Sequence, residues 1–322
     1  MCAYTIGLDL GGTKIAAALV GEDGVPGFKV TELTHLEQGA DAVIERMAGC
    51  IRDLQAQSDA PVLGLGIGTA GMTDSVNGVV IMASNLKWKN VPVRRLLAEK
   101  LGQDWLERTW VDKDTNAAVL GERLYGAGRG SRHMLYVTVG TGVGGGMVLD
   151  GKLYHGASQG ASDIGHLVML PEGPLCGCGK RGCLEALSSG PAIARTTTEA
   201  LESGAESQLR LTFAARPLSA QDVVEAALRG DALSCQVMEQ AGTWLGRGLA
   251  YYVDINNPEF IIIGGGIAAG GLLLEPVRRA ISQFALPANT AAVQVLPAGL
   301  GPDSGVIGAA ALAWHQLEHT SF

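Results

Sequence analysis

Three cysteines lie close together in the pattern Cys176-x-Cys178-x4-Cys183, and His166 precedes them. Three thiolates and an imidazole make the closed tetrahedral ligand set of a structural zinc ion. Small glycines between the cysteines allow the chain to wrap around an ion. We therefore predict that these four residues bind a structural Zn²⁺ that has no open position for catalytic water. A group of incidental buried cysteines is the alternative.

Two glycine-rich turns each follow an apolar run. The first is Gly11-Gly12-Thr13-Lys14, preceded by Asp9, and the second spans 140–146, with hydroxyls from Thr138 and Thr141. Backbone N–H groups in such turns can point at an anion. Neither turn has the P-loop pattern, and the second enters a strand rather than the helix of a dinucleotide fingerprint. A tight hairpin is the alternative for either turn alone, whereas two equivalent turns favour a shared polyphosphate.

A third glycine cluster, Gly264-Gly265-Gly266, follows the apolar run 260–263 and is expected to lead into a helix. Strand, glycines and helix in this order permit close approach by a flat or phosphorylated ligand. Packing glycines at a strand-to-helix turn would give the same pattern, so both interpretations stay open.

Three carboxylates stand where they can contact a ligand. Asp114 lies at a predicted strand-to-helix junction, where a helix N-cap is the alternative role. Asp163 precedes His166 by three residues, and Glu185 follows Cys183 by two. A metal that fixes His166 and the cysteine loop also fixes these two acids, and sugar hydroxyls require such fixed acceptors. Solvated surface acids are the alternative. The other histidines, including His155, look like ordinary surface or packing residues.

These residues need an α/β framework to position them. Apolar periodicity predicts strands at 4–10, 15–20, 61–69, 79–82, 109–113, 134–139, 146–149 and 260–263. It predicts helices at 41–57, 93–101, 115–125, 188–204, 219–227, 231–253 and 305–316, with an irregular surface loop at 205–217. The strand–glycine turn–strand unit near residue 10 recurs near residue 140, which indicates two related α/β halves.

Composition narrows the class of protein. A chain of 322 residues with 47% hydrophobic residues can build about two domains with sizeable cores. A net charge of −8 argues against nucleic-acid or anionic-membrane binding. The longest apolar runs are short and broken by glycine, so we expect no membrane span. The start of the chain has no signal-peptide pattern, and a metal-type cysteine cluster suggests a reducing cytoplasm.

Taken together, four motifs resemble the ROK family of bacterial sugar kinases and related repressors. They are Asp9-Leu10-Gly11-Gly12-Thr13-Lys14, the 140–146 turn, Asp163-Ile164-Gly165-His166, and the segment from Cys176 to Glu185. The resemblance runs from about residue 4 to about residue 316, and the segments 84–92 and 116–122 look most like the glucokinase branch. It implies an actin-like ATPase fold, in which two ribonuclease-H-like α/β domains flank a cleft. Residues 1–117 plus 305–322 would form the small N-terminal domain, and 118–304 the large domain with the zinc loop.

The resemblance also implies a function, which is ATP-dependent phosphorylation of a hexose hydroxyl, most closely the 6-hydroxyl of glucose or a near relative. Asp114 matches the general base. The sugar would contact Asn85, Lys113, Asp114, Asp163, His166 and Glu185. ATP with Mg²⁺ would bind at Asp9, Gly11, Gly12, Thr13, Lys14, Thr138, Gly140, Thr141, Gly142, Gly264, Gly265 and Gly266.

Two departures from the glucokinase pattern leave the sugar open. Lys113 stands where Asn usually precedes the base, and Asp163 replaces the usual Glu. N-acetylmannosamine or another amino sugar is therefore an alternative substrate. We also expect a lysine beside the base to depress the pKa of Asp114 through its charge.

A sugar-sensing repressor of the same family is a different class of function. It would need an N-terminal DNA-binding domain, but the first predicted strand begins at residue 4. A sugar-binding regulatory protein without that domain remains an alternative, although Asp9, Asp114 and both glycine turns are present. Family habit suggests a homodimer.

Overall fold

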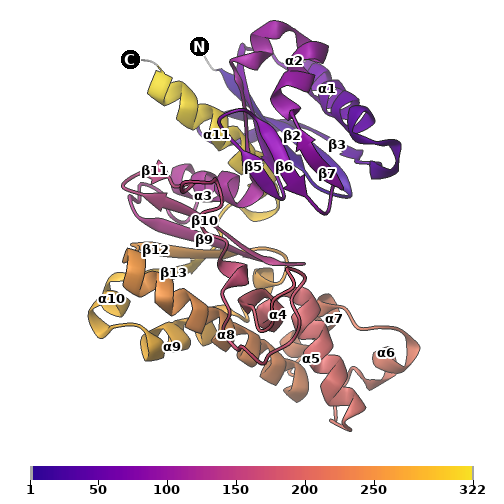
Figure 1. The fold of residues 1–322 in the computed structure, drawn as a ribbon, viewed down its shortest axis with the longest axis vertical. Coiled ribbons are helices and arrows are strands. Elements are labelled where there is room, and N and C mark those ends of the chain that lie inside the picture. Colours follow the sequence, from indigo (N-terminus) through magenta and orange to yellow (C-terminus); the bar gives the residue numbers. More distant parts are fainter. Residues whose placement is uncertain (1–2, 321–322) are drawn as a thin grey trace. The chain divides into compact units, whose positions relative to one another are not determined.

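The computed structural model describes residues 3–320, apart from the side chains of residue 269 and of residues 318–320. The chain forms two compact units (Figure 1). The first takes in the chain up to Gly130, Gly146–Ala161 and the chain from Gly299 onward; the second takes in Ser131–Gly145 and Ser162–Ala298. These units have different limits from the two predicted domains, 1–117 plus 305–322 and 118–304, whose boundaries stay a prediction.

The first unit contains a five-stranded sheet with the order β3-β2-β1-β4-β8. Its strands are β1 (Tyr4–Leu10), β2 (Lys14–Gly21), β3 (Pro26–Leu33), β4 (Val62–Thr69) and β8 (Thr109–Lys113). Strand β2 runs antiparallel to β1 and β3, whereas β1, β4 and β8 are parallel. Because the carboxyl ends of parallel strands meet at one edge, the acid at the end of β1 and the acid directly after β8 are brought to the same edge of the sheet.

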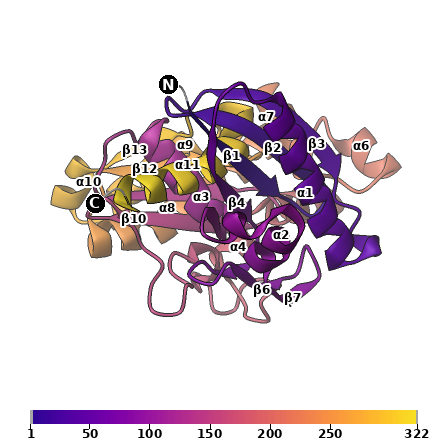
Figure 2. The ribbon, with the colours of Figure 1, turned by 90° about the horizontal axis from the view of Figure 1, so that it is seen from above.

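Helices cover both faces of this sheet (Figures 1 and 2). Helices α1 (Ala40–Gln57) and α2 (Val93–Leu101) lie on one face, and α3 (Asp114–Leu124) and α11 (Ser304–Thr320) on the other. Helix α11 packs directly on the strands, because a Cβ on Gly66 would lie only 1.7 Å from the Ala309 carbonyl oxygen. The unit is completed by a small sheet of β5 (Met72–Asp74), β6 (Val79–Ala83) and β7 (Trp88–Val91), and by short 3₁₀ helices at Leu36–Gln38, Gln103–Leu106 and Gly301–Asp303.

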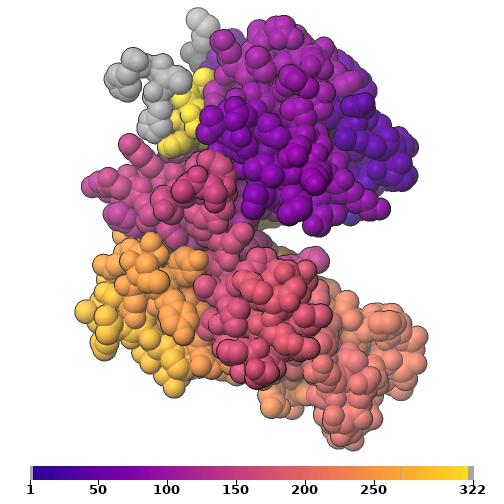
Figure 3. Space-filling model, in the orientation of Figure 1, coloured from indigo at the N-terminus to yellow at the C-terminus, as the bar shows by residue number. Residues whose placement is uncertain are grey.

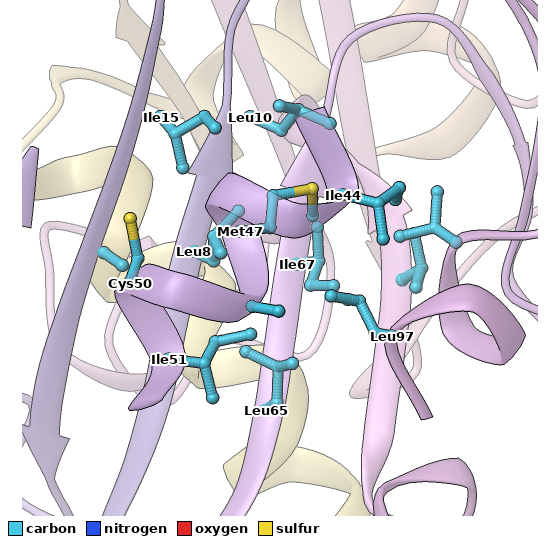
Figure 4. Packing of buried hydrophobic residues seen from close by; sticks show 14 of the residues in the cluster. Leu8, Leu10, Ile15, Ile44, Met47, Cys50, Ile51, Leu65, Ile67 and Leu97 are labelled. Carbon is cyan, nitrogen blue, oxygen red and sulfur yellow. The ribbon is translucent and has the colours of Figure 1, made fainter. Parts of the chain in front are cut away.

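The core of the first unit lies between α1 and the sheet (Figure 4). Ile44, Met47 and Ile51 project from α1 at helical spacing and are fully buried. They pack with Leu8 of β1 and Ile67 of β4. Burial of each such side chain contributes roughly 1.5–3 kcal/mol, so this contact holds the strand ends that carry the candidate site.

The second sheet has the order β11-β10-β9-β12-β13. Its strands are β9 (Met134–Val139), β10 (Val143–Leu149), β11 (Lys152–Leu153), β12 (Phe260–Gly264) and β13 (Gln294–Pro297). Strands β9, β12 and β13 are parallel. If the strands of each sheet are numbered along the chain, both sheets have the spatial order 3-2-1-4-5. This shared order confirms the prediction of two related halves.

The second unit also carries most of the helices and the cysteine loop. The helices are α4 (Leu184–Ser188), α5 (Gly190–Glu202), α6 (Arg210–Ala215), α7 (Ala220–Leu228), α8 (Ala232–Asn256), α9 (Leu274–Phe284) and α10 (Pro287–Ala292). Short 3₁₀ helices occupy Ile164–His166 and Ala268–Gly270. Within residues 3–320, no helix combines the length and the apolar character needed to cross a membrane.

Two predictions about local structure were wrong. The segment 205–217 is not wholly irregular, since it contains α6, which lies on the surface (Figure 3). Leu211 of α6 is exposed. Asp231, at the N-cap of α8, holds this segment by accepting hydrogen bonds from Ser207 Oγ and Gln208 N. The Gly264–Gly266 segment leads into a single 3₁₀ turn rather than an α-helix, and Gly271, with φ of 72°, ends that turn.

Candidate active site

The first glycine turn joins β1 to β2 and is held by its own backbone and by a distant threonine. Gly11 N donates to Lys14 O at 3.0 Å. Thr34, which is fully buried, donates from its backbone N to Thr13 O at 2.9 Å and from Oγ1 to Gly11 O at 2.8 Å. Sequence reasoning missed Thr34, because no motif marks a residue that reaches the turn from the end of β3.

Asn85 lies against the same turn. A Cβ on Gly12 would be 3.0 Å from the Asn85 carbonyl oxygen, so the absence of a side chain at residue 12 allows the two segments to touch. The structure thus brings together a residue predicted to contact sugar and a turn predicted to contact phosphate.

Asp9 is the carboxylate next to this turn. A Cβ on Gly305, in the first turn of α11, would lie 2.4 Å from Asp9 Oδ2, so the start of that helix packs closely on the carboxylate. The pKa of Asp9 is raised to about 6, chiefly by burial and then by the charge of Asp114, while the charge of Lys14 opposes both effects. Asp9 and Asp114 are therefore close enough to interact electrostatically.

Asp114 is the first residue of α3, directly after β8. It is not the N-cap, a position that Lys113 occupies, and its Oδ1 accepts a hydrogen bond from Thr115 N at 2.7 Å. Burial raises the pKa of Asp114, while the Thr115 hydrogen bond and the charge of Lys113 lower it. The expectation that the charge of Lys113 depresses this pKa is confirmed, but desolvation outweighs the lysine, so the net shift is upward.

The other two glycine segments meet in the second unit. Gly140 N donates to Gly142 O at 2.9 Å, which closes the tight turn, and Gly190 N donates to Gly140 O at 2.8 Å. Strand β12 places Gly264 opposite Thr138. Gly265 has φ of 93°, and a Cβ on it would lie 2.4 Å from the Val139 carbonyl oxygen. Backbone from two predicted phosphate-contact segments therefore lies side by side.

The predicted metal ligands converge. The ligand atoms of His166, Cys176, Cys178 and Cys183 all lie within 4.8 Å of one another. Cys178 Sγ is 3.6 Å from Cys183 Sγ, and Cys176 Sγ is 3.8 Å from His166 Nδ1. A zinc ion with bonds of about 2.3 Å to sulfur sets tetrahedral corners about 3.8 Å apart, so the cluster could hold this ion.

Backbone contacts fix the cysteine loop. Cys176 N donates to Lys180 O at 2.8 Å, and Gly179 N, at a φ of 88°, donates to Cys176 O at 2.9 Å. An isolated β-bridge joins Val168 to Cys183. The segment after His166 is thereby paired with the last cysteine.

Glu185 connects the cysteine loop to the second glycine turn. It lies in the first turn of α4, where its Oε2 accepts a hydrogen bond from Val143 N at 3.1 Å. Its Oε1 is 3.6 Å from Cys176 Sγ. A Cβ on Gly142 would lie 2.5 Å from Glu185 Oε2, so this turn accommodates the carboxylate only as glycine.

Asp163 precedes the 3₁₀ turn that ends at His166. His166 N donates to Asp163 O at 3.2 Å. Burial raises the pKa of Tyr252, on α8, and the charge of Asp163 raises it further. Tyr252 is a neighbour of the site that sequence reasoning did not identify, although it lies within the predicted 231–253 helix.

The sequence model described as "ROK family" matches residues 5–316. The chain belongs to the ROK family. Among its relatives in the family, a glucokinase of Thermotoga maritima is 38% identical over 310 residues, which are 95% of this chain and 96% of that protein. The fold is the actin-like ATPase fold of ROK sugar kinases, which confirms the predicted fold class.

Two solved ROK structures superpose on nearly the whole chain. The ROK hexokinase of Thermus thermophilus is 34% identical, with a TM-score of 0.81 and coverage of 98% of this chain and 99% of that one. A ROK glucokinase of Streptomyces griseus in complex with glucose and AMPPNP is 32% identical, with a TM-score of 0.82 and coverage of 97% and 99%.

Proposed function

We propose that this ROK protein is an ATP-dependent sugar kinase that phosphorylates a hexose, with the 6-hydroxyl of glucose or a close relative as the acceptor. The observation that carries the proposal is Asp114, a carboxylate at the start of α3 whose pKa is raised by burial. The glucokinase relatives and the glucose and AMPPNP complex of a similar structure support the substrate class.

Asp114 acts as the general base. A sugar hydroxyl is a weak nucleophile, and it attacks the terminal phosphorus of ATP more readily when its proton has an acceptor within hydrogen-bond reach. A carboxylate with a raised pKa is a stronger acceptor than an ordinary one. Thr115 N fixes Oδ1 of this carboxylate, so Oδ2 is the oxygen that receives the proton.

The glycine turns bind the phosphates. Residues 11–14, 140–142 and 264–266 supply backbone N–H groups that suit phosphoryl oxygens, and Lys14 adds a positive charge. Asp9 fits a magnesium ion by its chemistry, because carboxylate oxygens are ligands that Mg²⁺ prefers. When bound with ATP, the ion neutralises charge that develops on the phosphoryl oxygens.

Part of the sugar site consists of residues that the cysteine loop positions. His166, Cys176, Cys178 and Cys183 would hold a zinc ion, whose four bonds would fix the loop in place. His166 turns Nδ1 toward the cluster, so its Nε2 is the nitrogen that meets a sugar hydroxyl. Asp163, Glu185, Asn85 and Lys113 complete the sugar contacts.

The test is an ADP-release screen across glucose, other hexoses, amino sugars and sugar acids. We expect ATP-dependent turnover with at least one neutral hexose, and a fall in kcat of at least ~10²-fold for Asp114→Asn and Asp114→Ala. Asp53→Asn, which makes the same change on an exposed carboxylate of α1, is the matched control. Near-normal turnover by either Asp114 variant contradicts the proposal, as does an absence of ADP release with every sugar.

Several further statements stay predictions. The cysteine usage supports a cytoplasmic location, and family habit supports a homodimer. The negative net charge supports a small-molecule substrate rather than a nucleic acid.

A further inference from the structure

One histidine outside the predicted site contacts the strand that leads to Asp114. His155 lies in the segment that follows β11, and its Nε2 is 2.6 Å from Oδ2 of Asp112 in β8. The side chain of Asp112 is only 6% exposed, and that of His155 is 25% exposed. The pair is therefore largely shielded from solvent. In such surroundings, removal of one partner leaves the other buried without its hydrogen bond, which destabilises the folded state.

The carboxylate of Asp112 accepts hydrogen bonds from one residue on each side of Asp114 in the sequence. Its Oδ1 accepts hydrogen bonds from Lys113 N at 2.7 Å and from Asn116 Nδ2 at 2.8 Å. Lys113 precedes Asp114, and Asn116 lies in the first turn of α3. Rotation or withdrawal of the Asp112 carboxylate would thus shift the backbone at the junction that aims Asp114.

The segment that carries His155 is itself anchored. Ala161 N donates to His155 O at 3.0 Å, which closes a short loop, and Ser75 Oγ donates to Gln159 Oε1 at 2.7 Å. In sequence, this loop leads within a few residues to Asp163 and His166. The His155 contact therefore fastens this loop to β8, the strand that directly precedes the base.

We propose that His155 is a positioning residue for phosphoryl transfer, which acts by holding the Asp112 carboxylate and, through it, the junction that carries Asp114. The inference rests on the kinase function proposed above. His155 touches neither substrate, and its contribution is to keep the base within hydrogen-bond reach of the sugar hydroxyl, where displacements near 1 Å cost about 10²-fold in rate.

The electrostatic surroundings of the pair are mixed. The pair lines a cavity of about 660 Å³, together with Arg94 of α2, Lys152 of β11 and His315 of α11. Its hydrogen bond with Asp112 raises the pKa of His155 above the ordinary value, against the effect of burial. A donor on Nε2 is present in both the charged ring and the neutral Nε2–H tautomer, so the positioning role depends on the donor rather than on the charge.

Two amide substitutions at residue 155 separate positioning from simple packing. In His155→Gln, the side-chain amide can take the place of Nε2 and still donate to Asp112, whereas in His155→Asn the amide is too short to reach. We expect kcat to fall at least about tenfold in His155→Asn, with KM for sugar and ATP within about twofold, and most of that loss to be recovered in His155→Gln. His155→Leu removes the donor altogether and should behave like His155→Asn.

Controls make each outcome decisive. Lys152→Leu alters the same cavity without a contact to Asp112 and should leave kcat unchanged. A kcat in His155→Asn within twofold of the wild type overturns the inference, and so does an equal loss in the Asn and Gln variants or an effect confined to KM. If Asp114→Asn keeps its activity, the proposed function fails; if Asp114→Asn is inactive while His155→Asn is normal, only the positioning role fails.

Discussion

Replacing Asp9 with asparagine is expected to stabilise the protein while it removes activity. The pKa of Asp9 is raised from 3.8 to about 6, chiefly by burial and then by the charge of Asp114. A carboxyl group whose pKa is raised on folding lowers the free energy of unfolding at neutral pH, because its ionised form is less stable in the folded protein than in the unfolded chain. The neutral amide of Asp9→Asn removes this cost but also removes the carboxylate proposed to fit magnesium.

The magnitude follows from the shift. A rise of about two pKa units corresponds to about 3 kcal/mol of free energy of unfolding at a pH above 6, which is an upper limit. A buried amide also loses hydration, and the variant forfeits the attraction of Lys14. We therefore expect Asp9→Asn to raise the free energy of unfolding by roughly 1–2 kcal/mol and the Tm by a few degrees.

The difference in stability between Asp9→Asn and the wild type should grow as the pH rises. Below the unfolded pKa of 3.8, Asp9 is protonated in both states and contributes no difference. As the pH rises from about 4 to about 6, the unfolded chain releases this proton before the folded chain does, so the wild type loses stability relative to the variant. Above about pH 6 the gap between the two proteins should stay constant.

Thermal unfolding of both proteins from pH 4.5 to pH 8, without added magnesium or nucleotide, measures this gap. Asp53→Asn on the exposed surface of α1 is the matched control and should show no such pH-dependent gap. A variant that is less stable than the wild type at pH 8, or a gap that does not change between pH 4.5 and pH 6.5, would refute the argument.

Three further predictions test other parts of the site. Thr34→Val removes the hydroxyl that donates to Gly11 O. We expect the free energy of unfolding to fall by about 1 kcal/mol and the KM for ATP to rise. An unchanged KM for ATP would count against the role of the turn. Cys178→Ser should lower the zinc content of purified protein by at least about half, measured by elemental analysis, whereas Cys235→Ser on α8 should not; equal zinc in both variants would contradict the site. Because Asp114 must be ionised to accept a proton and its pKa is raised, kcat/KM should fall as the pH drops through a value above the ordinary carboxyl range, and full activity at pH 4 would exclude this assignment.

The sequence predicted those parts of the site that local spacing determines. The three-cysteine pattern, together with His166, predicted four metal ligands, and the structure places their ligand atoms within 4.8 Å of one another. The apolar run before Asp9 identified β1 with its observed limits, Tyr4–Leu10. In both cases the evidence lies within a short stretch of chain, because a metal loop and a buried strand are each built largely from neighbouring residues.

Contacts between distant segments escaped prediction. Thr34 reaches the first glycine turn from the end of β3, and His155 reaches Asp112 from a segment 43 residues away. The direction of the Asp114 pKa shift was missed for a related reason. Lys113 is visible next to Asp114 in the sequence, but the burial that outweighs its charge arises from the packing of whole elements.

The acids near the carboxyl ends of β1 and β8 show how one fold separates structural from chemical carboxylates. Asp112 is enclosed by hydrogen bonds with Lys113 N, Asn116 and His155, so both of its carboxyl oxygens have partners within the protein. Asp9 and Asp114 instead have raised pKa values, since burial and, for Asp9, a like charge act on them with less compensation. Such carboxylates lower the stability of the folded protein, and groups of this kind are typical of sites that bind a ligand or accept a proton. By this reasoning we expect the satisfied acid to position the junction and the two destabilised acids to carry out the proposed chemistry.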